Sequence, residues 1–522
     1  MTEWSLLPRG TQHLIFEILA QDLEAKGSKT RTKKSGLSQY ALVCKTWQEF
    51  FEKKLYRHLT LDPSSLDDFD EIVHRQRTLV EHIWLRVELE TYKCPDCVRF
   101  RKVSDYEANS AIIGDTINWL FYILSTWDCG EVKASPDLVL EISAYSPSDM
   151  QHIFKNDLYF DTSPFTTGEL EDLQPKSSHQ HHGWVNGQRS RAPDIDAISR
   201  IFGPVSPDFG SGLSVVRAVR GLVIRRQTRH HFDPGRMVRS LPNLRFMNYE
   251  PWREFFCFAD GKYHADSGER VSILLISSNN LTSISFVIGT RMLVSHSLPR
   301  TLKDLTIFED FNEDYTFIHC TDMMAKEYPC PPELVRTPSQ AVGAALAKRS
   351  LSLNRLAASY MVDAADFFKV TKPEWSWNSL TAIHLTSRFL VSAVDASLVN
   401  RLLLYAGMTA LQMPKLRKMN VWNGTRGNAC TFRYEVTDGL ATVGWHGTWD
   451  LALESRVIDV WEKVARRHTG RSLTVRRSRL LDQSSITSHA IAIQELGLSN
   501  DVIHPVSLKQ IKKETERYFW KY

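Results

Sequence analysis

The feature that most constrains the fold is a short pattern that recurs along much of the chain. In each copy a leucine or a similar residue is followed, two residues later, by a stretch in which apolar and polar residues alternate. Alternation with a period of two is typical of a β-strand that buries one face. The copies are TLVEHIWLRVELETY (78–92), VRAVRGLVIRRQ (216–227), LPNLRFMNYEPW (241–252), LPRTLKDLTIFEDF (298–311), SLNRLAASYMVDA (352–364), WNSLTAIHLTSRFL (377–390) and MPKLRKMNVWNG (413–424).

The spacing of these copies predicts an elongated array. From Val223 to Met419 the strand centres are separated by 24, 60, 50, 26 and 36 residues. The short steps match the roughly 20–29 residues of a leucine-rich repeat. Helical segments such as 395–413 lie between the strands, which favours a parallel sheet with right-handed crossovers. The 522 residues exceed one ordinary compact domain, whereas in a curved solenoid each repeat packs only on its neighbours.

We therefore predict an α/β protein with three parts. Residues 1–61 form an all-α module with a basic insertion at 24–36, interpreted as a solvated loop. Residues 62–425 form an irregular leucine-rich-repeat-like α/β solenoid with an exposed, partly disordered insertion at about 160–200. Residues 426–522 form a C-terminal α/β cap that packs on the repeat domain and closes its end. The cap contains a hairpin that turns at Asp438-Gly439, a helix at 455–468, a strand at 472–480 and a helix at 488–498.

The first sixty residues carry more apolar side chains than so small a module needs for its own core. After LLP at 6–8, the apolar residues of the next segment follow helical spacing. LSQYALVCKTWQEFFEKKLYRHLTL (37–61) then predicts one helix capped by Ser38. Its apolar positions cover much of the helix circumference, so this helix must be buried on more than one side. The surplus apolar surface predicts a protein partner.

These residues, in this order, resemble an F-box. The pattern of that family is Leu-Pro, an amphipathic helix, a leucine, Val-Cys-Lys-x-Trp, and a closing leucine–aromatic pair before a strand. This sequence supplies Leu7-Pro8, Leu37, Val43-Cys44-Lys45, Trp47 and Leu55-Tyr56. The basic insertion departs from the short connection usual in the family, which bears on the geometry between the first two helices.

The resemblance implies a three-helix module that docks on the Skp-type adaptor of a cullin–RING ubiquitin ligase, and through that adaptor on the cullin scaffold. The alternative is that the Val-Cys-Lys-x-Trp residues only fill the core of the module itself. The positions that the resemblance assigns to adaptor binding are Leu7, Pro8, Ile15, Ile18, Leu37, Val43, Cys44 and Trp47.

Nearly the whole chain also resembles a group of fungal F-box proteins that have a long C-terminal domain of unassigned function. Segments such as AYSPSDMQHIF, YEPWREF and WHGTW carry this likeness, which brings no known chemistry with it. It implies a substrate-recognition subunit of an SCF-type ligase whose repeat domain binds a protein target. Two alternatives stay open: a scaffold outside any ligase that keeps a degenerate F-box, and an uncharacterised enzyme within about 200–520.

Two groups of residues could bind a metal ion. Cys94-Pro95-Asp96-Cys97 contains the only close cysteine pair, but a structural zinc site needs four ligands. Cys129, Cys320, Cys330 or a histidine could complete the set only through distant folding, so we interpret this pair as a plain turn. The second group is a histidine-rich loop, which we interpret as solvated and which contains His179, His181 and His182. We predict no metal ligand and no cofactor.

Two charged clusters have equally simple interpretations. The basic cluster could meet acidic protein or phosphate, but it lies beside a predicted strand, where alternate arginines would face water. The acidic cluster is interpreted as a solvated turn. Their members are Arg217, Arg220, Arg225, Arg226, Arg229, His230 and His231 in the first, and Glu309, Asp310, Glu313 and Asp314 in the second. The chain contains no glycine-rich phosphate loop, HExxH or GxSxG, and we predict no catalytic residue and no enzyme.

Net charge and the distribution of apolar residues exclude further classes of protein. The formal net charge of +4 is small for this length, so it does not mark a nucleic-acid-binding chain. No run of about twenty apolar residues predicts a membrane span, and the N-terminus lacks the pattern of a secretory signal. We therefore expect reduced cysteines and a cytoplasmic or nuclear location.

Overall fold

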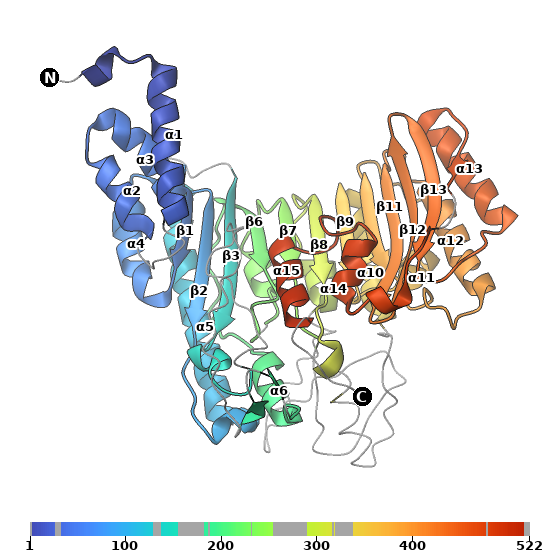
Figure 1. Ribbon diagram of the computed structural model, residues 1–522, viewed down its shortest axis with the longest axis horizontal. Helices are drawn as coiled ribbons and strands as arrows, with labels where there is room; N and C mark the ends of the chain where they lie inside the picture. Colours follow the sequence, from blue (N-terminus) through green and yellow to red (C-terminus); the bar gives the residue numbers. More distant parts are fainter. Residues whose placement is uncertain are drawn as a thin grey trace.

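An open sheet of thirteen strands runs through the described part of the molecule (Figure 1). The computed structural model describes residues 3–26, 33–128, 137–154, 182–185, 188–189, 191–230, 232–253, 290–315, 318, 338–476 and 479–515. The sheet follows the chain, because each strand from β1 to β13 pairs with the sheet strand next to it in sequence. The fold class is therefore α/β with an open, mostly parallel sheet, and none of the helices described is long and apolar enough to cross a bilayer.

Within this sheet, neighbouring strands from β1 to β11 pair in parallel, whereas β11, β12 and β13 form antiparallel hairpins. Each of the seven predicted stretches contains one of these strands. The strand β3 was not predicted. The bounds are β1 (His58–Leu61), β2 (His82–Glu88), β3 (Leu138–Tyr145), β6 (Val219–Ile224), β7 (Phe246–Tyr249), β8 (Asp304–Phe308), β9 (Arg355–Ser359), β10 (Ala382–Thr386), β11 (Lys418–Thr425), β12 (Asn428–Thr437), β13 (Leu440–Gly447), β14 (Thr474–Val475) and β15 (Arg479–Leu480).

A ladder of apolar residues fixes the register of the parallel strands. One apolar side chain from each strand is paired with its counterpart on the next strand, and all of them are buried on the same face. A shift by one residue would turn this whole row toward the other face, so the row specifies the register. The central members are Leu222, Met247, Leu305, Leu356, Ile383 and Met419.

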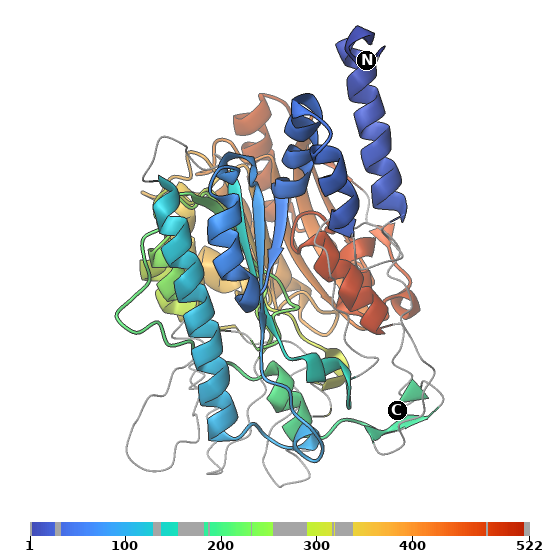
Figure 2. The same cartoon turned by 90° about the vertical axis from the view of Figure 1, so that its left-hand side faces the viewer.

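Helices cover this apolar face and form the main core with it. The long helix α5 lies on one side of the sheet and the α14–α15 pair lies on the other, as Figure 2 shows. The helices of the apolar face are α4 (Leu66–Val73), α5 (Val103–Ser125), α7 (Gly235–Arg239), α10 (Gln340–Arg349), α11 (Ala364–Lys369), α12 (Ala396–Ala410) and α13 (Ser455–Thr469).

The second face of the sheet is polar in its centre and is covered by the C-terminal helices α14 (His489–Glu495) and α15 (Pro505–Thr515). Asn420 on β11 bonds the ring of His384 at 2.8 Å and accepts from Arg433 at 3.1 Å, and the Arg433 guanidinium also bonds the backbone of the α14 segment. These polar groups are buried, so they need such partners. The β12–β13 hairpin and α13 extend the end of the sheet, but α14 and α15 fold back across its face rather than closing that end.

Two short regions bear on the insertion predicted at about 160–200. Residues 155–181 lie outside the described part, and β4 (Trp184–Val185) and β5 (Gln188–Arg189) form a small hairpin after them. The helix α6 (Ile195–Phe202) is buried along most of its length. It packs on Phe154, Trp252 and Tyr315 in a separate apolar cluster. The expectation that the insertion is exposed up to about residue 200 is therefore wrong for its last residues.

Candidate protein-docking surface

The N-terminal helices build a small core of their own. They are α1 (Arg9–Lys26), α2 (Lys33–Ala41) and α3 (Lys45–Arg57). Phe16 and Phe51 are fully buried between them, and the Trp47 ring lies 5.0 Å from Phe16 and 5.6 Å from Phe51. The first pair is edge-to-face and the second is stacked, and such aromatic pairs contribute roughly 0.5–1.5 kcal/mol each beyond area burial. This cluster is separate from the main core of the sheet.

The prediction of one helix starting at Ser38 is wrong. The helix α2 ends at Ala41, and tightened turns bond the amide of Val43 to the carbonyl of Tyr40 at 3.2 Å. Cys44 is extended, with φ of −166°, and precedes the first turn of α3. A continuous helix would be apolar all round, whereas two helices let Tyr40 and Phe51 meet at 5.1 Å within one core. The predicted basic loop is also shorter, because only residues 27–32 separate α1 from α2 and lie outside the described part.

Several large apolar side chains of this module are exposed to solvent. Leu42 is 85% exposed and Val43 is 58% exposed, in the turn between α2 and α3. Leu14 and Ile18 are exposed one helical turn apart on α1. Leu6, also exposed, belongs to the turn that the Trp4–Trp47 contact of 5.3 Å holds against the start of α3. We call Leu6, Leu14, Ile18, Leu42 and Val43 the exposed apolar surface.

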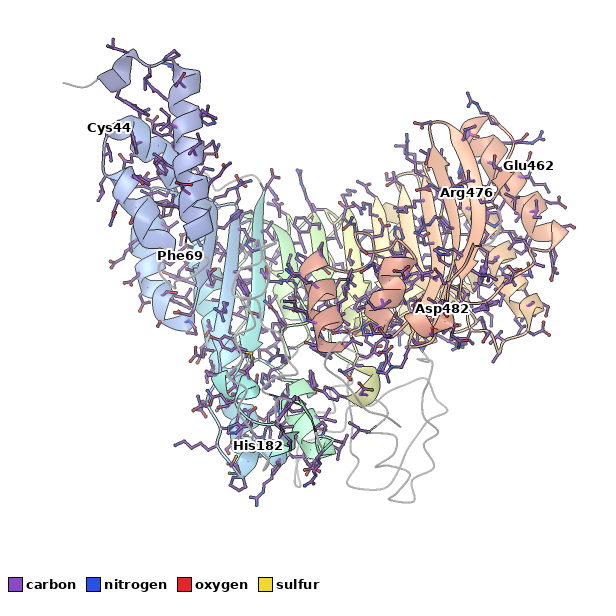
Figure 3. All side chains as sticks on the ribbon, in the orientation of Figure 1. Cys44, Phe69, His182, Glu462, Arg476 and Asp482 are labelled. Atoms are coloured by element: carbon purple, nitrogen blue, oxygen red, sulfur yellow. The ribbon has the colours of Figure 1, made fainter. Side chains whose placement is uncertain are left out.

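The predicted adaptor-binding residues divide between this surface and the module core. Leu37 and Trp47 pack into the core, so for Trp47 the alternative interpretation describes its contacts. Leu7 and Ile15 are half-buried. The exposed members are Pro8, Ile18, Val43 and Cys44, and Cys44 lies near the outer end of the helices in Figure 3. Sequence reasoning missed Leu6, Leu14 and Leu42, because helical spacing alone does not show which apolar stripe faces inward.

The basic and acidic clusters meet in a buried ionic network, so the expectations of water-facing arginines and a solvated turn are wrong here. Arg226 pairs with Asp310 and donates two hydrogen bonds to Glu514 of α15 at 2.9 and 2.6 Å. Its backbone amide donates to Glu250 at 3.1 Å. Arg226, Glu250 and Asp310 each follow a parallel strand, and such strand ends meet at one edge of the sheet. The position of each residue directly after a strand was therefore the sequence signal that could have indicated this network.

The other described members of the two clusters differ in burial. Arg225 is buried and pairs with Glu141 at 2.5 Å, and His230 is buried 3.2 Å from Asp149. Arg229 and Glu309 are also buried. Arg217 is exposed, as expected of a strand flank. His231 lies outside the described residues.

His489 on α14 joins the network from the opposite side. Its Nε2 lies 3.3 Å from Asp310, and its Nδ1 lies 3.7 Å from Glu313. Burial lowers the pKa of His489, but the two carboxylates outweigh burial and raise it to about 9. Burial likewise raises the pKa of Asp310, yet Arg226 and His489 hold it below its usual value. The ionised forms of these groups thus attach the C-terminal helices to the sheet.

A recess lies beside this network, at the carboxyl ends of the central strands. Arg253, Phe311, Tyr360 and Arg388 contribute to its lining. Each arginine faces a buried carboxylate, Arg253 at 3.7 Å from Glu309 and Arg388 at 3.6 Å from Asp363. The charges of the two arginines are therefore balanced by carboxylates within the fold.

The predicted metal candidates come together as well. Cys94, Cys97 and His182 lie side by side, and His152, which sequence reasoning missed, completes a group of four possible ligands. A turn at Pro95-Asp96 is present, since the amide of Asp96 donates to the carbonyl of Lys93 at 2.9 Å. His179, His181, Cys129, Cys320 and Cys330 lie outside the described residues.

The fold and these sites define a large α/β protein with a separate helical module. Comparison with known protein families matches residues 297–504 to a family of unknown function, DUF6546. The match begins before β8 and ends after α14, so it covers the C-terminal half of the sheet and not the N-terminal module. No curated protein and no solved structure matches the chain.

Proposed function

We propose that this protein is a substrate-recognition subunit of an SCF-type cullin–RING ubiquitin ligase. The N-terminal helices act as an F-box module that binds a Skp-type adaptor, and the sheet domain binds a protein target. In this proposal the protein performs no covalent chemistry, because it positions a target for an enzyme held elsewhere on the scaffold.

The observation that carries the proposal is the exposed apolar surface. Monomeric proteins rarely expose contiguous apolar patches larger than a few hundred Å², and patches above that size mark interaction sites. Here Leu42 and Val43 are exposed in the Val-Cys-Lys-x-Trp segment that resembles the F-box, while Trp47 of the same segment holds the core. The exposure of Leu42 and Val43 shows that no described segment of the sheet domain covers this turn.

The sheet domain supports the proposal through its repeat-like order. We propose that it is an irregular leucine-rich-repeat-like solenoid. Successive strands lie side by side in chain order, and one apolar residue of each strand joins the same ladder. A repeat array, in which each unit packs on its neighbours, would have this order of strands. Such a frame would hold a target at a fixed distance from the adaptor, with α14 and α15 across the middle of one face.

The test is binding of the purified full chain to a Skp-type adaptor, measured by co-purification and by biolayer interferometry. We expect Val43→Asp to weaken binding at least about tenfold, because it places a carboxylate in an apolar contact. The change should cost the fold little, since Val43 is 58% exposed. Val475→Asp is the matched control, because Val475 is 46% exposed at the far end of the sheet. It should bind like the wild type.

Two results would overturn the proposal. One is that the wild-type chain fails to associate under conditions in which a known F-box protein binds the same adaptor. The other is that Val43→Asp binds as tightly as Val475→Asp. In either case the scaffold alternative would be favoured, because a degenerate F-box would serve only as a structural module. Trp47→Ala cannot distinguish the ligase proposal from the scaffold alternative. Trp47 packs in the core, so its loss would disturb the module in either case.

A further inference from the structure

Four side chains from three separate segments converge below the sheet. Cys94 and Cys97 belong to the loop after β2, His152 follows β3, and His182 begins the short hairpin segment before α6. One ligand atom of each lies within 4.8 Å of all the others. Figure 3 labels His182 at the lower end of the molecule, far from Cys44 on the N-terminal helices.

Four of the six distances among these atoms lie close to, and somewhat below, the edge lengths of a tetrahedron around one zinc ion. Cys94 Sγ lies 3.2 Å from Cys97 Sγ, 3.5 Å from His152 Nδ1 and 3.0 Å from His182 Nε2, and Cys97 Sγ lies 3.5 Å from His182 Nε2. Zinc–ligand bonds of about 2.3 Å for sulfur and about 2.0–2.1 Å for nitrogen place two sulfurs about 3.8 Å apart and a sulfur and a nitrogen about 3.6 Å apart. The observed spacings agree within several tenths of an ångström.

The loop between the two cysteines favours this arrangement. A Cys-x-x-Cys spacing directs two thiols to one point when a turn reverses the chain between them. The turn is made by Pro95 and Asp96, with the amide of Val98 donating to the carbonyl of Pro95 at 3.3 Å. Cys94 is exposed and Cys97 is buried, so the pair reaches from the surface into the fold.

A second set of contacts orients one of the histidines. His152 Nε2 lies 3.2 Å from the backbone carbonyl of Tyr92, and the two rings stack at 5.6 Å. A carbonyl can only accept, so Nε2 carries the proton and Nδ1 offers its lone pair toward Cys94. Metal-bound histidines are typically held in this way by a backbone carbonyl or a carboxylate. The hydroxyl of Tyr92 in turn donates to the buried Asp149 at 3.1 Å.

The hairpin segment that begins at His182 also fixes the position of this histidine. Gly183 has φ of +77°, which favours glycine, and a Cβ there would lie 2.9 Å from the carbonyl oxygen of Arg191. The next residue, Trp184, is buried and donates from its indole to the carbonyl of Ile153 at 2.8 Å. His152 and His182 are therefore each one or two residues from a contact that ties their two segments together.

We propose that Cys94, Cys97, His152 and His182 bind one Zn²⁺ ion. Two thiolates and two imidazoles form a donor set that zinc prefers. All four positions around the ion would be filled by protein, which is the composition of a structural site rather than a catalytic one. The ion would join the loop after β2 to segments 58 and 88 residues further along the chain, in a region whose own apolar cluster is small.

The experiment is metal analysis of the full chain, expressed without a polyhistidine tag and purified without added metal. Inductively coupled plasma mass spectrometry should find about one zinc per chain in the wild type. Replacement by Co²⁺ should give the intense visible bands of a tetrahedral thiolate-bound cobalt ion. His182→Asn and Cys94→Ser should each lower the zinc content severalfold and remove those bands. Cys44→Ser is the control, because it removes an exposed cysteine outside the group and should retain the zinc.

The wild-type zinc content and the cobalt spectrum decide whether the chain binds a tetrahedral thiolate-bound metal ion even if a variant folds poorly, and the variants then locate the site. Less than about one tenth of a zinc per folded chain, together with no cobalt band, would overturn it. A mass decrease of two hydrogens that locates a Cys94–Cys97 disulfide in the freshly isolated chain would also overturn it, since it would identify a redox pair. A zinc content that Cys44→Ser lowers as much as His182→Asn would place the metal elsewhere.

Discussion

The contact between His489 and two carboxylates predicts how the stability of the C-terminal helices depends on pH. The pKa of His489 is raised from 6.5 to about 9 in the fold. A histidine with a raised pKa stabilises the fold fully below its unfolded pKa, and this contribution disappears as the pH rises through the folded pKa. The window is therefore about pH 6.5 to 9. A difference of about 2.5 pKa units corresponds to about 3 kcal/mol.

The perturbation is His489→Gln, compared with the wild type by urea unfolding at about pH 6 and about pH 9.5. Near pH 6 the wild type should be more stable by the full charge contribution of about 3 kcal/mol, in addition to the cost of lost packing. Near pH 9.5 little more than the packing cost should remain, because the imidazole is then mostly neutral in both states. Hydrogen exchange of α14 should show the same change locally, since α14 carries His489.

The matched control is His384→Gln, a second buried histidine on the same face of the sheet. Burial lowers the pKa of His384 from 6.5 to about 4, so near pH 6 the imidazole is protonated mainly in the unfolded state. His384→Gln should therefore cost somewhat less near pH 6 than near pH 9.5, which is the opposite of the pH dependence expected for His489→Gln. The reasoning is refuted if the free-energy difference between wild type and His489→Gln is equal at both pH values. It is also refuted if His384→Gln shows the same pH dependence.

Two further predictions concern packing and charge elsewhere in the fold. Glu514→Gln leaves Arg226 with one carboxylate instead of two, and breaking a buried pair should cost about 3–5 kcal/mol, measured as a lower urea midpoint. Gly407→Ala on α12 places a methyl 2.6 Å from Val460 and 3.1 Å from the indole nitrogen of Trp461, so overpacking should cost about 1–3 kcal/mol, measured by thermal unfolding. A stability equal to wild type in either variant would contradict these contacts.

The strands could be predicted because their signal is local. Alternation around Leu222, Leu305 and Ile383 reports a buried face whatever the neighbouring strands are, and the helices between them favour parallel pairing. The Asp438-Gly439 hairpin turn is confirmed for the same reason, with φ of +52° and +73° at its two residues.

The sites could be predicted less well than the strands, because the residues that meet at each site are distant in sequence. Arg226 meets a carboxylate 288 residues away, and no local pattern shows that an arginine after a strand will be covered by the last helix of the chain. His152 has no metal-binding neighbour in its own segment, so it carried no signal without Cys94 and His182. The break at Leu42 was missed because the apolar residues on either side read as one continuous helix.

The proposed docking surface and the proposed zinc site can be tested independently, because they belong to different cores. The N-terminal module has its own aromatic cluster and joins the sheet where α3 runs directly into β1, with Arg57 paired to Glu81 at 2.7 Å. In Figure 3 Cys44 lies on the N-terminal helices above the sheet, and His182 lies below the sheet. If His182→Asn loses zinc while adaptor binding persists, the helical module functions without the lower loops. If Val43→Asp loses the adaptor while the zinc remains, the effect of the substitution is confined to the helical module and leaves the lower loops intact.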